Sequence, residues 1–284
     1  MVTSDAPIAS RVGVDILRAG GNAVDAAVAT GFALAVVYPE AGNLGGGGFT
    51  LVRMADGRVA GIDYREVAPI PATRTMFLDD SGRATNASVV GPLASGVPGA
   101  VAGMVETHRR FGRLTLAQVM APAIRLADEG FAVDSLLARS LANHAALIGR
   151  FNGGNVFLPG GTPLARGTAL RQPALARTLR AIADSGAAAF YSGGLAHVIA
   201  EDLRGAGSII TYDDLARYEA EWREPIRATY RGHTLLTMPP PSSGVTMIEI
   251  LNILEGFHPL PPFASDRESD RMSPWRSRRP LTTA

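Results

Sequence analysis

The segment from residue 23 to residue 37 constrains the fold more than any other part of this 284-residue chain. Its residues are almost all Ala, Val, Leu, Phe, Gly and Thr, and its single charged residue is Asp25. A helix that is apolar on every side must be buried on nearly all sides. At about 15 residues it is shorter than the roughly 20 that a membrane-spanning helix requires. The segment therefore predicts the central helix of a globular core.

Patterns on either side of this helix predict a mixture of helices and strands. The Gly-Gly-Asn sequence at residues 20–22 ends a preceding helix over residues 10–18, and Pro39 ends the apolar helix itself. Residues 49–54 and 59–64, joined by a short turn, predict a hairpin. Further helices are expected over residues 98–111, 116–130, 196–203, 211–221 and 246–255, with a strand pair over residues 226–230 and 233–237. Hairpins among buried helices favour an α+β domain.

Composition excludes several classes of function. Apolar residues make up 46% of the chain and charged residues 19%, with a net charge of +1, so the concentrated basic surface of a nucleic-acid binder is absent and no nucleic-acid partner is expected. The absence of cysteine excludes thiol nucleophiles, disulfides and Cys-ligated zinc. All 27 basic residues are arginine, which excludes a lysine nucleophile or Schiff base. No cofactor motif is present, and none is expected to be needed.

Four consecutive glycines, residues 45–48, precede the first strand of the hairpin. Glycines allow backbone N–H groups to approach a ligand closely and allow positive φ. A P-loop is excluded because no Gly-Lys-Ser/Thr follows, and a dinucleotide fingerprint would need a strand before the glycines and a helix after them. Two interpretations remain at this point: a tight structural turn, or a segment that lines a binding site.

Arg65 follows the return strand of the hairpin and offers a fixed fork of donors suited to a carboxylate. The competing interpretation is an ordinary ion pair with a neighbouring acid, Glu66 or Asp63. From the chemistry of the side chains alone, this second interpretation is the more economical one.

No convincing nucleophile accompanies this arginine. The sequence contains no Gly-x-Ser-x-Gly elbow, and its histidines are scattered without metal-ligand spacing, so no metal site is expected. Ser242 and Ser243 follow three prolines and precede Gly244, a pattern that favours a turn before a helix over a nucleophile. The Asn86-Ala87-Ser88 triplet is a glycosylation acceptor only in a secreted protein.

Several segments together resemble the γ-glutamyltransferase family, also called glutathione hydrolases. They occur in the order typical of the family between residues 1 and 263. The matching segments are residues 1–4 with 7 and 9–10, residues 20–27, residues 45–49, residues 63–66 (Asp-Tyr-Arg-Glu) with 68–69, residues 96–99 with 103, residues 121–131, residues 190–191, and residues 239–244 leading into 251–255. Any one of these would be modest support, whereas the ordered set identifies the chain as similar to the family's large subunit.

This resemblance implies a fold, a reaction and a role for Arg65. The family fold is the four-layer αββα sandwich of the N-terminal-nucleophile hydrolases, which would be incomplete in this chain. A proenzyme cleaves itself, and the new N-terminal threonine of the small subunit attacks the γ-glutamyl amide of glutathione or a related compound. The acyl group then passes to water or to an amino acid. Arg65 matches the arginine that holds the glutamyl α-carboxylate, which reverses the preference for an ion pair stated above.

The departures from the family pattern are equally specific. Residues 1–263 are expected to form the large-subunit-like domain, and residues 264–284 an unmatched tail rich in Arg, Ser and Pro. The tail admits three interpretations: a disordered end, a basic interaction segment, or the product of a shifted reading frame. The small subunit with its threonine is missing, so the chain alone is expected to be inactive. Thr282 and Thr283 do not replace it, because their surroundings differ from those of the family's Thr-Thr.

Two further functions and the compartment stay open. The same fold accommodates an amidase or acylase of another acyl group, such as a cephalosporin side chain or poly-γ-glutamate. A noncatalytic remnant that binds γ-glutamyl compounds is the alternative from a different class. No signal peptide is expected in this chain, because a cationic start and a small-residue cleavage site are both lacking, and no membrane partner is expected.

Overall fold

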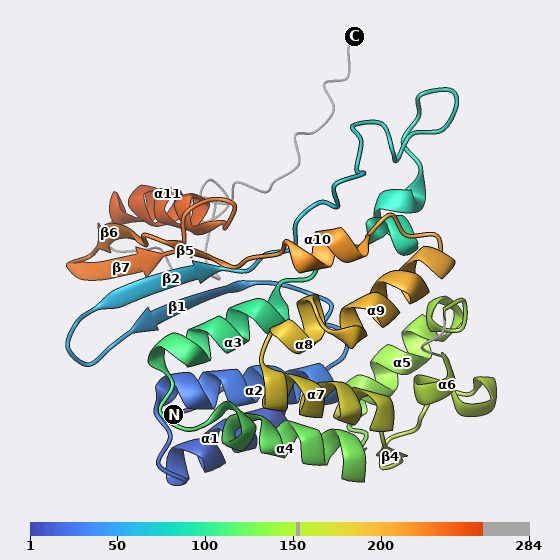
Figure 1. The fold of residues 1–284 in the computed structure, drawn as a ribbon. Coiled ribbons are helices and arrows are strands. Elements are labelled where there is room, and N and C mark those ends of the chain that lie inside the picture. The colour runs from blue at the N-terminus through green and yellow to red at the C-terminus, as the bar shows by residue number, and fades with distance from the viewer. Residues whose placement is uncertain (152–153, 258–284) are drawn as a thin grey trace. The chain divides into compact units, whose positions relative to one another are not determined.

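The structure is a computed structural model that describes residues 1–151 and 154–257 (Figure 1). Contacts divide the chain into two units, Met1–Arg223 and Glu224–Ala284, which are described separately below. The helices of the first unit are α1 (Pro7–Arg18), α2 (Ala23–Val37), α3 (Ala100–Phe111), α4 (Leu116–Glu129), α5 (Ser135–Ile148), α6 (Gly154–Phe157), α7 (Pro173–Ser185), α8 (Ala188–Tyr191), α9 (Gly194–Gly205) and α10 (Tyr212–Ala216). Its strands are β1 (Phe49–Arg53), β2 (Val59–Asp63), β3 (Phe131–Ala132), β4 (Ala169–Leu170) and β5 (Glu221–Arg223).

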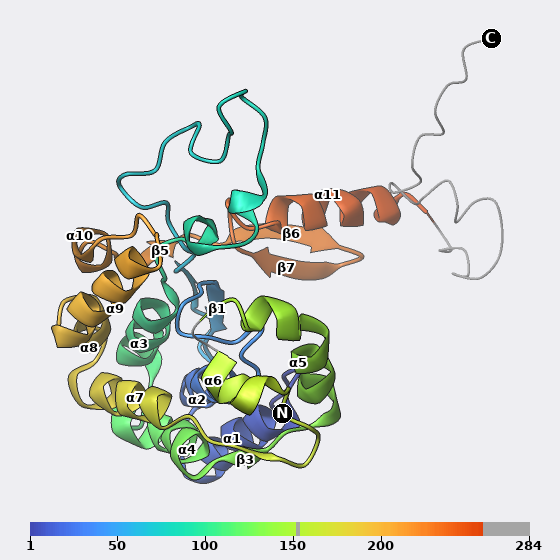
Figure 2. The same cartoon turned by 90° about the vertical axis from the view of Figure 1, so that its right-hand side faces the viewer.

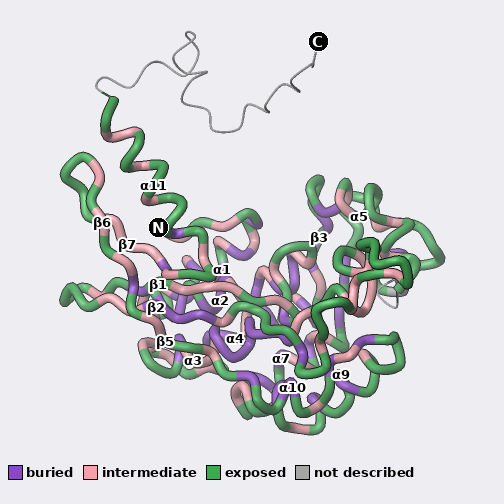
Figure 3. Tube along the Cα trace, turned by 90° about the horizontal axis from the view of Figure 1, so that it is seen from above, coloured by how far each residue is buried: buried purple, intermediate pink, exposed green. Residues whose placement is uncertain are grey.

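Helix α2 is the buried centre that the sequence predicted, with the same bounds. Its residues Phe32, Ala33 and Val36 are completely buried, and buried residues (purple in Figure 3) run along its length. Helices α1, α3 and α4 pack against it, and α7 packs against α4. The helix begins where it does because the side chain of Asn22 accepts the backbone N–H groups of Val24 and Asp25.

Asp25 ties the start of α2 to a distant loop. Its carboxylate is fully buried, and it accepts the backbone N–H of Asn22 at 2.8 Å, completing a capping box. It also accepts the backbone N–H groups of Arg113 at 3.0 Å and Leu114 at 3.3 Å, which lie between α3 and α4. The Nε2 atom of His108 lies 3.4 Å from the same carboxylate. One buried side chain therefore fixes the relative positions of α2, α3 and α4.

The sheet of the first unit has the order β1-β2-β5, and both pairings are antiparallel. The β1–β2 hairpin matches the prediction, and α3 packs against both strands. The prediction of a helix over residues 211–221 is wrong in its second half, because α10 ends at Ala216 and β5 begins at Glu221. Glu221 pairs with Asp63 of β2, and this long-range pairing overrides the local helical pattern.

A long connection runs from β2 to α3. Between Asp63 and Ala100 the chain forms two short 3-10 turns, Asn86–Ser88 and Pro92–Ala94, and otherwise follows loop geometry (Figure 2, teal). Its first residues are Tyr64 and Arg65, so the candidate substrate-binding arginine stands where the rigid hairpin gives way to a loop. Binding residues are often placed on loops that a rigid scaffold positions.

The second unit contains a hairpin and a helix. Strands β6 (Ile226–Tyr230) and β7 (His233–Thr237) are antiparallel and meet at a tight turn, with Arg231 and Gly232 both at positive φ. Helix α11 (Gly244–Glu255) follows the proline turn, where Ser242 accepts the backbone N–H of Gly244 and donates to the carbonyl of Met238. This pair of bonds confirms the structural interpretation of the serine turn.

The mixture of helices and antiparallel hairpins confirms the predicted α+β class. The predicted tail, residues 264–284, lies outside the described residues, and the domain boundary at residue 263 stays a prediction. Within the part of the chain that the structure describes, none of the helices combines the length and the apolar character that crossing a membrane requires.

Candidate functional site

Arg65 is exposed and lies two residues after Asp63, the last residue of β2. Its backbone is held on both sides although its side chain reaches the surface. Its N–H donates to Oδ1 of Asp63 at 3.0 Å, and its carbonyl accepts the hydroxyl of Tyr218 at 2.9 Å. The starting point of the guanidinium is therefore fixed by two hydrogen bonds, one of them from a residue 153 positions away.

The contacts of Asp63 bear on the alternative interpretation of Arg65, in which its side chain forms an ion pair with Asp63 or Glu66. Asp63 is buried, and its second carboxylate oxygen accepts Nε of Arg223 from β5 at 2.8 Å. Arg223 also contacts Glu221 at 2.8 Å. Arg223 is thus a salt-bridge partner of Asp63, and Asp63 also accepts the backbone N–H of Arg65.

The glycine run packs against this segment. Gly48 exchanges both backbone hydrogen bonds with Tyr64, at 3.2 and 2.9 Å, and the carbonyl of Gly46 accepts the N–H groups of Gly99 and Ala100 at the start of α3. A Cβ atom at Gly47 would lie 2.5 Å from the carbonyl oxygen of Tyr64, so only glycine fits there. The run is therefore a tight structural turn that brings three segments together, and its first member, Gly45, also lines the cavity beside Arg65.

That cavity has a volume of about 600 Å³. One lining residue comes from the glycine turn, and the others come from the connection between β2 and α3. The lining residues are Gly45, Arg65, Glu66, Val67, Ala68, Pro69, Ala72, Thr73, Met76, Phe77, Leu93, Ala94, Ser95 and Gly96. A cavity lined by the Arg65 guanidinium among mostly apolar residues can take a carboxylate-bearing small molecule.

Substituting Gly47 with alanine is expected to lower the free energy of unfolding by about 1–3 kcal/mol, because the new methyl group would meet backbone atoms that cannot rotate away. The matched control is Gly45→Ala in the same run, where the nearest atom to an added Cβ is the Asn43 side chain at an ordinary 3.5 Å. Thermal unfolding of the full chain measures both. Equal losses of stability in the two variants would contradict the close approach described here.

The other sequence candidates do not join this cavity. His108 is buried, with Nε2 donating to the carbonyl of Leu114 at 3.0 Å, and Nδ1 of His144 lies 2.9 Å from the carbonyl of Ser140 in its own helix. His233 is in β7, and His258 lies outside the described residues. Over residues 1–151 and 154–257, no cluster of three His, Asp or Glu side chains could hold a metal ion.

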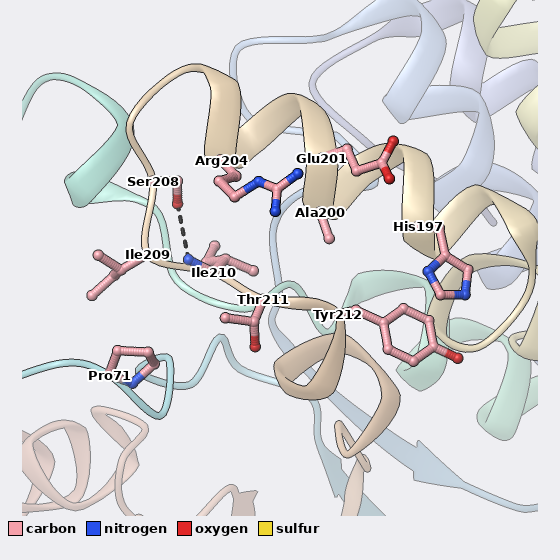
Figure 4. A pocket seen from close by; sticks show the side chains of 10 residues that line it. All are labelled: Pro71, His197, Ala200, Glu201, Arg204, Ser208, Ile209, Ile210, Thr211 and Tyr212. Atoms are coloured by element: carbon pink, nitrogen blue, oxygen red, sulfur yellow. Dashed lines mark hydrogen bonds between the residues drawn. The ribbon is translucent and has the colours of Figure 1, made fainter.

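His197 lines a separate cavity of about 470 Å³ between α9 and the start of α10 (Figure 4). Its ring stacks on Tyr212 with the centroids 4.0 Å apart, and Glu201, Arg204 and Thr211 lie along the same walls. The ring stacking gives His197 a packing role.

Comparison with known proteins decides the family. Residues 9–275 match the model of the gamma-glutamyltranspeptidase family, which is more than half of the chain. The chain belongs to the γ-glutamyltranspeptidase family. The resemblance expected from the ordered segments, to the large-subunit portion of that family, is thereby confirmed.

Individual relatives agree with this assignment. The chain is 48% identical to the glutathione hydrolase proenzyme of Escherichia coli, over 90% of the chain and 45% of that protein, and 43% identical to the acylase ACY 1 proenzyme of Pseudomonas sp., over 90% of the chain and 48% of that protein. The crystal structure of Helicobacter pylori γ-glutamyltranspeptidase superposes with a TM-score of 0.88 at 42% identity, covering 90% of this chain and 75% of that one. The N-terminal-nucleophile hydrolase type of fold is therefore confirmed.

The chain spans about half the length of the curated relatives it matches. Among the described residues that line the cavity beside Arg65, the hydroxyl side chains are those of Thr73 and Ser95. Sequence reasoning found Arg65 but missed Tyr218 and Arg223, because their contacts span more than 150 positions and leave no local pattern.

Proposed function

We propose that this γ-glutamyltranspeptidase-family chain supplies the carboxylate-binding part of an enzyme that cleaves γ-glutamyl amides such as glutathione. Arg65 binds the α-carboxylate of the γ-glutamyl group through its planar fork of N–H donors. The observation that carries this proposal is the placement of Arg65: an exposed arginine on a fixed backbone, beside a cavity of about 600 Å³, within the Asp-Tyr-Arg-Glu segment.

The chemical step is proposed to use a threonine from a small subunit outside these 284 residues. The threonine hydroxyl attacks the γ-carbonyl carbon while its own α-amine accepts the proton. The C–N bond breaks, the proton passes to the leaving amine, and a γ-glutamyl ester of the threonine remains. Water or the amine of an amino acid then attacks this ester, which releases the threonine. The reaction needs no cofactor.

Arg65 contributes orientation to this sequence. The α-carboxylate and the γ-carbonyl of a glutamyl group are separated by a short run of single bonds. Fixing the carboxylate therefore restricts where the γ-carbonyl can lie relative to the nucleophile. Holding reactants in the required geometry lowers the entropic part of the barrier. Arg65 would orient the substrate in this way whether water or an amino acid accepts the acyl group.

The full chain, purified by itself, is expected to release no p-nitroaniline from γ-glutamyl-p-nitroanilide and to undergo no self-cleavage. Co-expression with the part of the Escherichia coli proenzyme that follows the matched segment is expected to restore turnover, with that part expressed alone as the control. Turnover by the chain alone that is lost in Arg65→Ala would overturn the proposed need for a small subunit. Glutathione binding by calorimetry, with no turnover from the complex, would instead support a noncatalytic remnant.

An acylase acting on another acyl group is the second candidate, because a relative named acylase ACY 1 proenzyme is 43% identical to this chain. The two substrates share the carboxylate that Arg65 would contact and differ in the amine beside it. A glutaryl cephalosporin carries a carboxylate but no amine beside it, whereas a γ-glutamyl group carries both. Assaying the co-expressed complex with both substrates therefore separates the two functions: a higher kcat/KM for the glutaryl compound would favour the acylase.

A further inference from the structure

Two side chains that take no part in the proposed chemical step form hydrogen bonds with the backbone of Arg65. The Asp63 carboxylate accepts its N–H at 3.0 Å, and the Tyr218 hydroxyl donates to its carbonyl at 2.9 Å. Asp63 is the last residue of β2 and lies two positions before Arg65, so its bond is local. Tyr218 follows α10 and reaches Arg65 across 153 positions, so its bond ties the loop to a separate part of the same unit.

Tyr218 is itself held rigidly. Its side chain is 9% exposed, and its ring stacks on Tyr191 with the centroids 5.5 Å apart and the planes 16° apart. Tyr191 in turn donates to the carbonyl of Pro98 at 2.9 Å and accepts the N–H of Ala102 at 3.2 Å. The Tyr191 hydroxyl is thus bonded to the N-terminal end of α3, whereas the Tyr218 hydroxyl is bonded to Arg65.

The Tyr218 hydroxyl occupies space that a side chain at Gly99 would otherwise fill. A Cβ atom at Gly99 would lie 2.0 Å from this hydroxyl oxygen and 2.1 Å from the carbonyl oxygen of Tyr64. The absence of a side chain at Gly99 is thus what lets the hydroxyl reach the Arg65 carbonyl. The sequence around residues 96–99, which resembles the family pattern, fulfils a packing requirement of the Arg65 loop.

The protonation state of Tyr218 suits this role. Burial raises the pKa of its hydroxyl above the ordinary value, and the negative charges of Asp63, Glu66 and Glu221 raise it further. The phenol therefore stays protonated at neutral pH and remains a donor, which a carbonyl partner requires.

We infer that Tyr218 is a positioning residue for substrate binding: its hydroxyl fixes the backbone of Arg65 so that the guanidinium meets the substrate carboxylate. This inference rests on the proposed function, in which Arg65 binds the γ-glutamyl α-carboxylate. Tyr218 acts through Arg65 and makes no contact with substrate in this scheme. If the backbone of Arg65 is less well fixed, binding of the substrate and of the transition state weakens by the same amount. The expected effect is therefore a higher KM with little change in kcat.

The test compares Tyr218→Phe with Tyr191→Phe in the full chain co-expressed with the remaining part of the Escherichia coli proenzyme. Each variant deletes one buried hydroxyl from the same stack and leaves both rings in place, but only the first deletes the bond to Arg65. For γ-glutamyl-p-nitroanilide, Tyr218→Phe is expected to raise KM about fivefold with kcat within about twofold of the unmodified complex. Tyr191→Phe is expected to leave KM unchanged.

A purely structural role would give a different pattern, because a lower yield of assembled enzyme reduces the apparent kcat and leaves KM alone. An unchanged KM in Tyr218→Phe, or an equal rise in both variants, would overturn the positioning role. Arg65→Ala in the same assay separates the two proposals. If its KM is unchanged, or if the unmodified complex shows no turnover, the proposed function fails. If its KM rises strongly while that of Tyr218→Phe does not, only the positioning role fails.

Discussion

Replacing Arg65 with alanine in the co-expressed complex is expected to lower kcat/KM for γ-glutamyl-p-nitroanilide about 100-fold, mostly through KM. The loss corresponds to about 2.7 kcal/mol, the range expected when a charge-assisted bidentate contact to a carboxylate is removed. Arg65 binds a part of the substrate that does not change charge during the reaction. Its contribution is therefore made in the ground state and in the transition state alike. Steady-state kinetics with the substrate concentration extended well above the unmodified KM measure the effect.

Two further variants sharpen this result. Arg65→Lys keeps the positive charge but loses the planar fork, so an intermediate loss is expected. Arg58→Ala removes an exposed arginine from the far end of the same hairpin, where it pairs with Asp56 at 2.7 Å, and should change kcat/KM by less than about twofold. A loss of similar size in Arg58→Ala and Arg65→Ala would mean that the hairpin, rather than the Arg65 side chain, governs activity.

Local sequence signals predicted the scaffold of this site well. The apolar helix over residues 23–37 has the predicted bounds, since the Gly-Gly-Asn sequence at residues 20–22 precedes it and Pro39 follows it. The β1–β2 hairpin was also predicted, from two short strand-like segments joined by a short turn. Arg65 was a candidate because it follows a strand, and the role proposed for it rests on the resemblance to the family. The chemistry of the side chain alone favoured an ion pair.

Long-range contacts were beyond the reach of the sequence. Residues 217–221 carry a pattern compatible with continuing α10, yet β5 begins at Glu221 because β2 offers a strand edge with which to pair. Tyr218, which holds the Arg65 backbone, lies in this stretch, and Arg223, which pairs with Asp63, follows it in β5. Nothing in the local sequence marks them, since a tyrosine or an arginine near a strand is common. Their importance follows only from the fold that brings them to residues 63–65.

The largest loss of stability is expected from Asp25→Ala. The carboxylate is fully buried, and it accepts the backbone N–H groups of Asn22, Arg113 and Leu114. Alanine would leave these donors without the carboxylate at the N-terminal end of α2, where the helix dipole favours a negative charge. Each buried donor left unsatisfied costs about 1–3 kcal/mol. The free energy of unfolding is therefore expected to fall by about 3–5 kcal/mol, with the melting temperature lowered by about 10 °C.

The matched control is Asp15→Ala, which removes the same side chain from the neighbouring helix α1. Asp15 is exposed and pairs with Arg18 one turn away at 3.0 Å, a contact worth less than about 1 kcal/mol. Thermal unfolding of the full chain and of both variants, followed by circular dichroism, measures the difference. Asp25→Asn offers a second check, because its amide nitrogen would face backbone donors and should also destabilise the chain. A melting temperature for Asp25→Ala equal to that of Asp15→Ala would show that the loop between α3 and α4 is held by other contacts, such as that of Asn22 with the carbonyl of Phe111 at 2.6 Å.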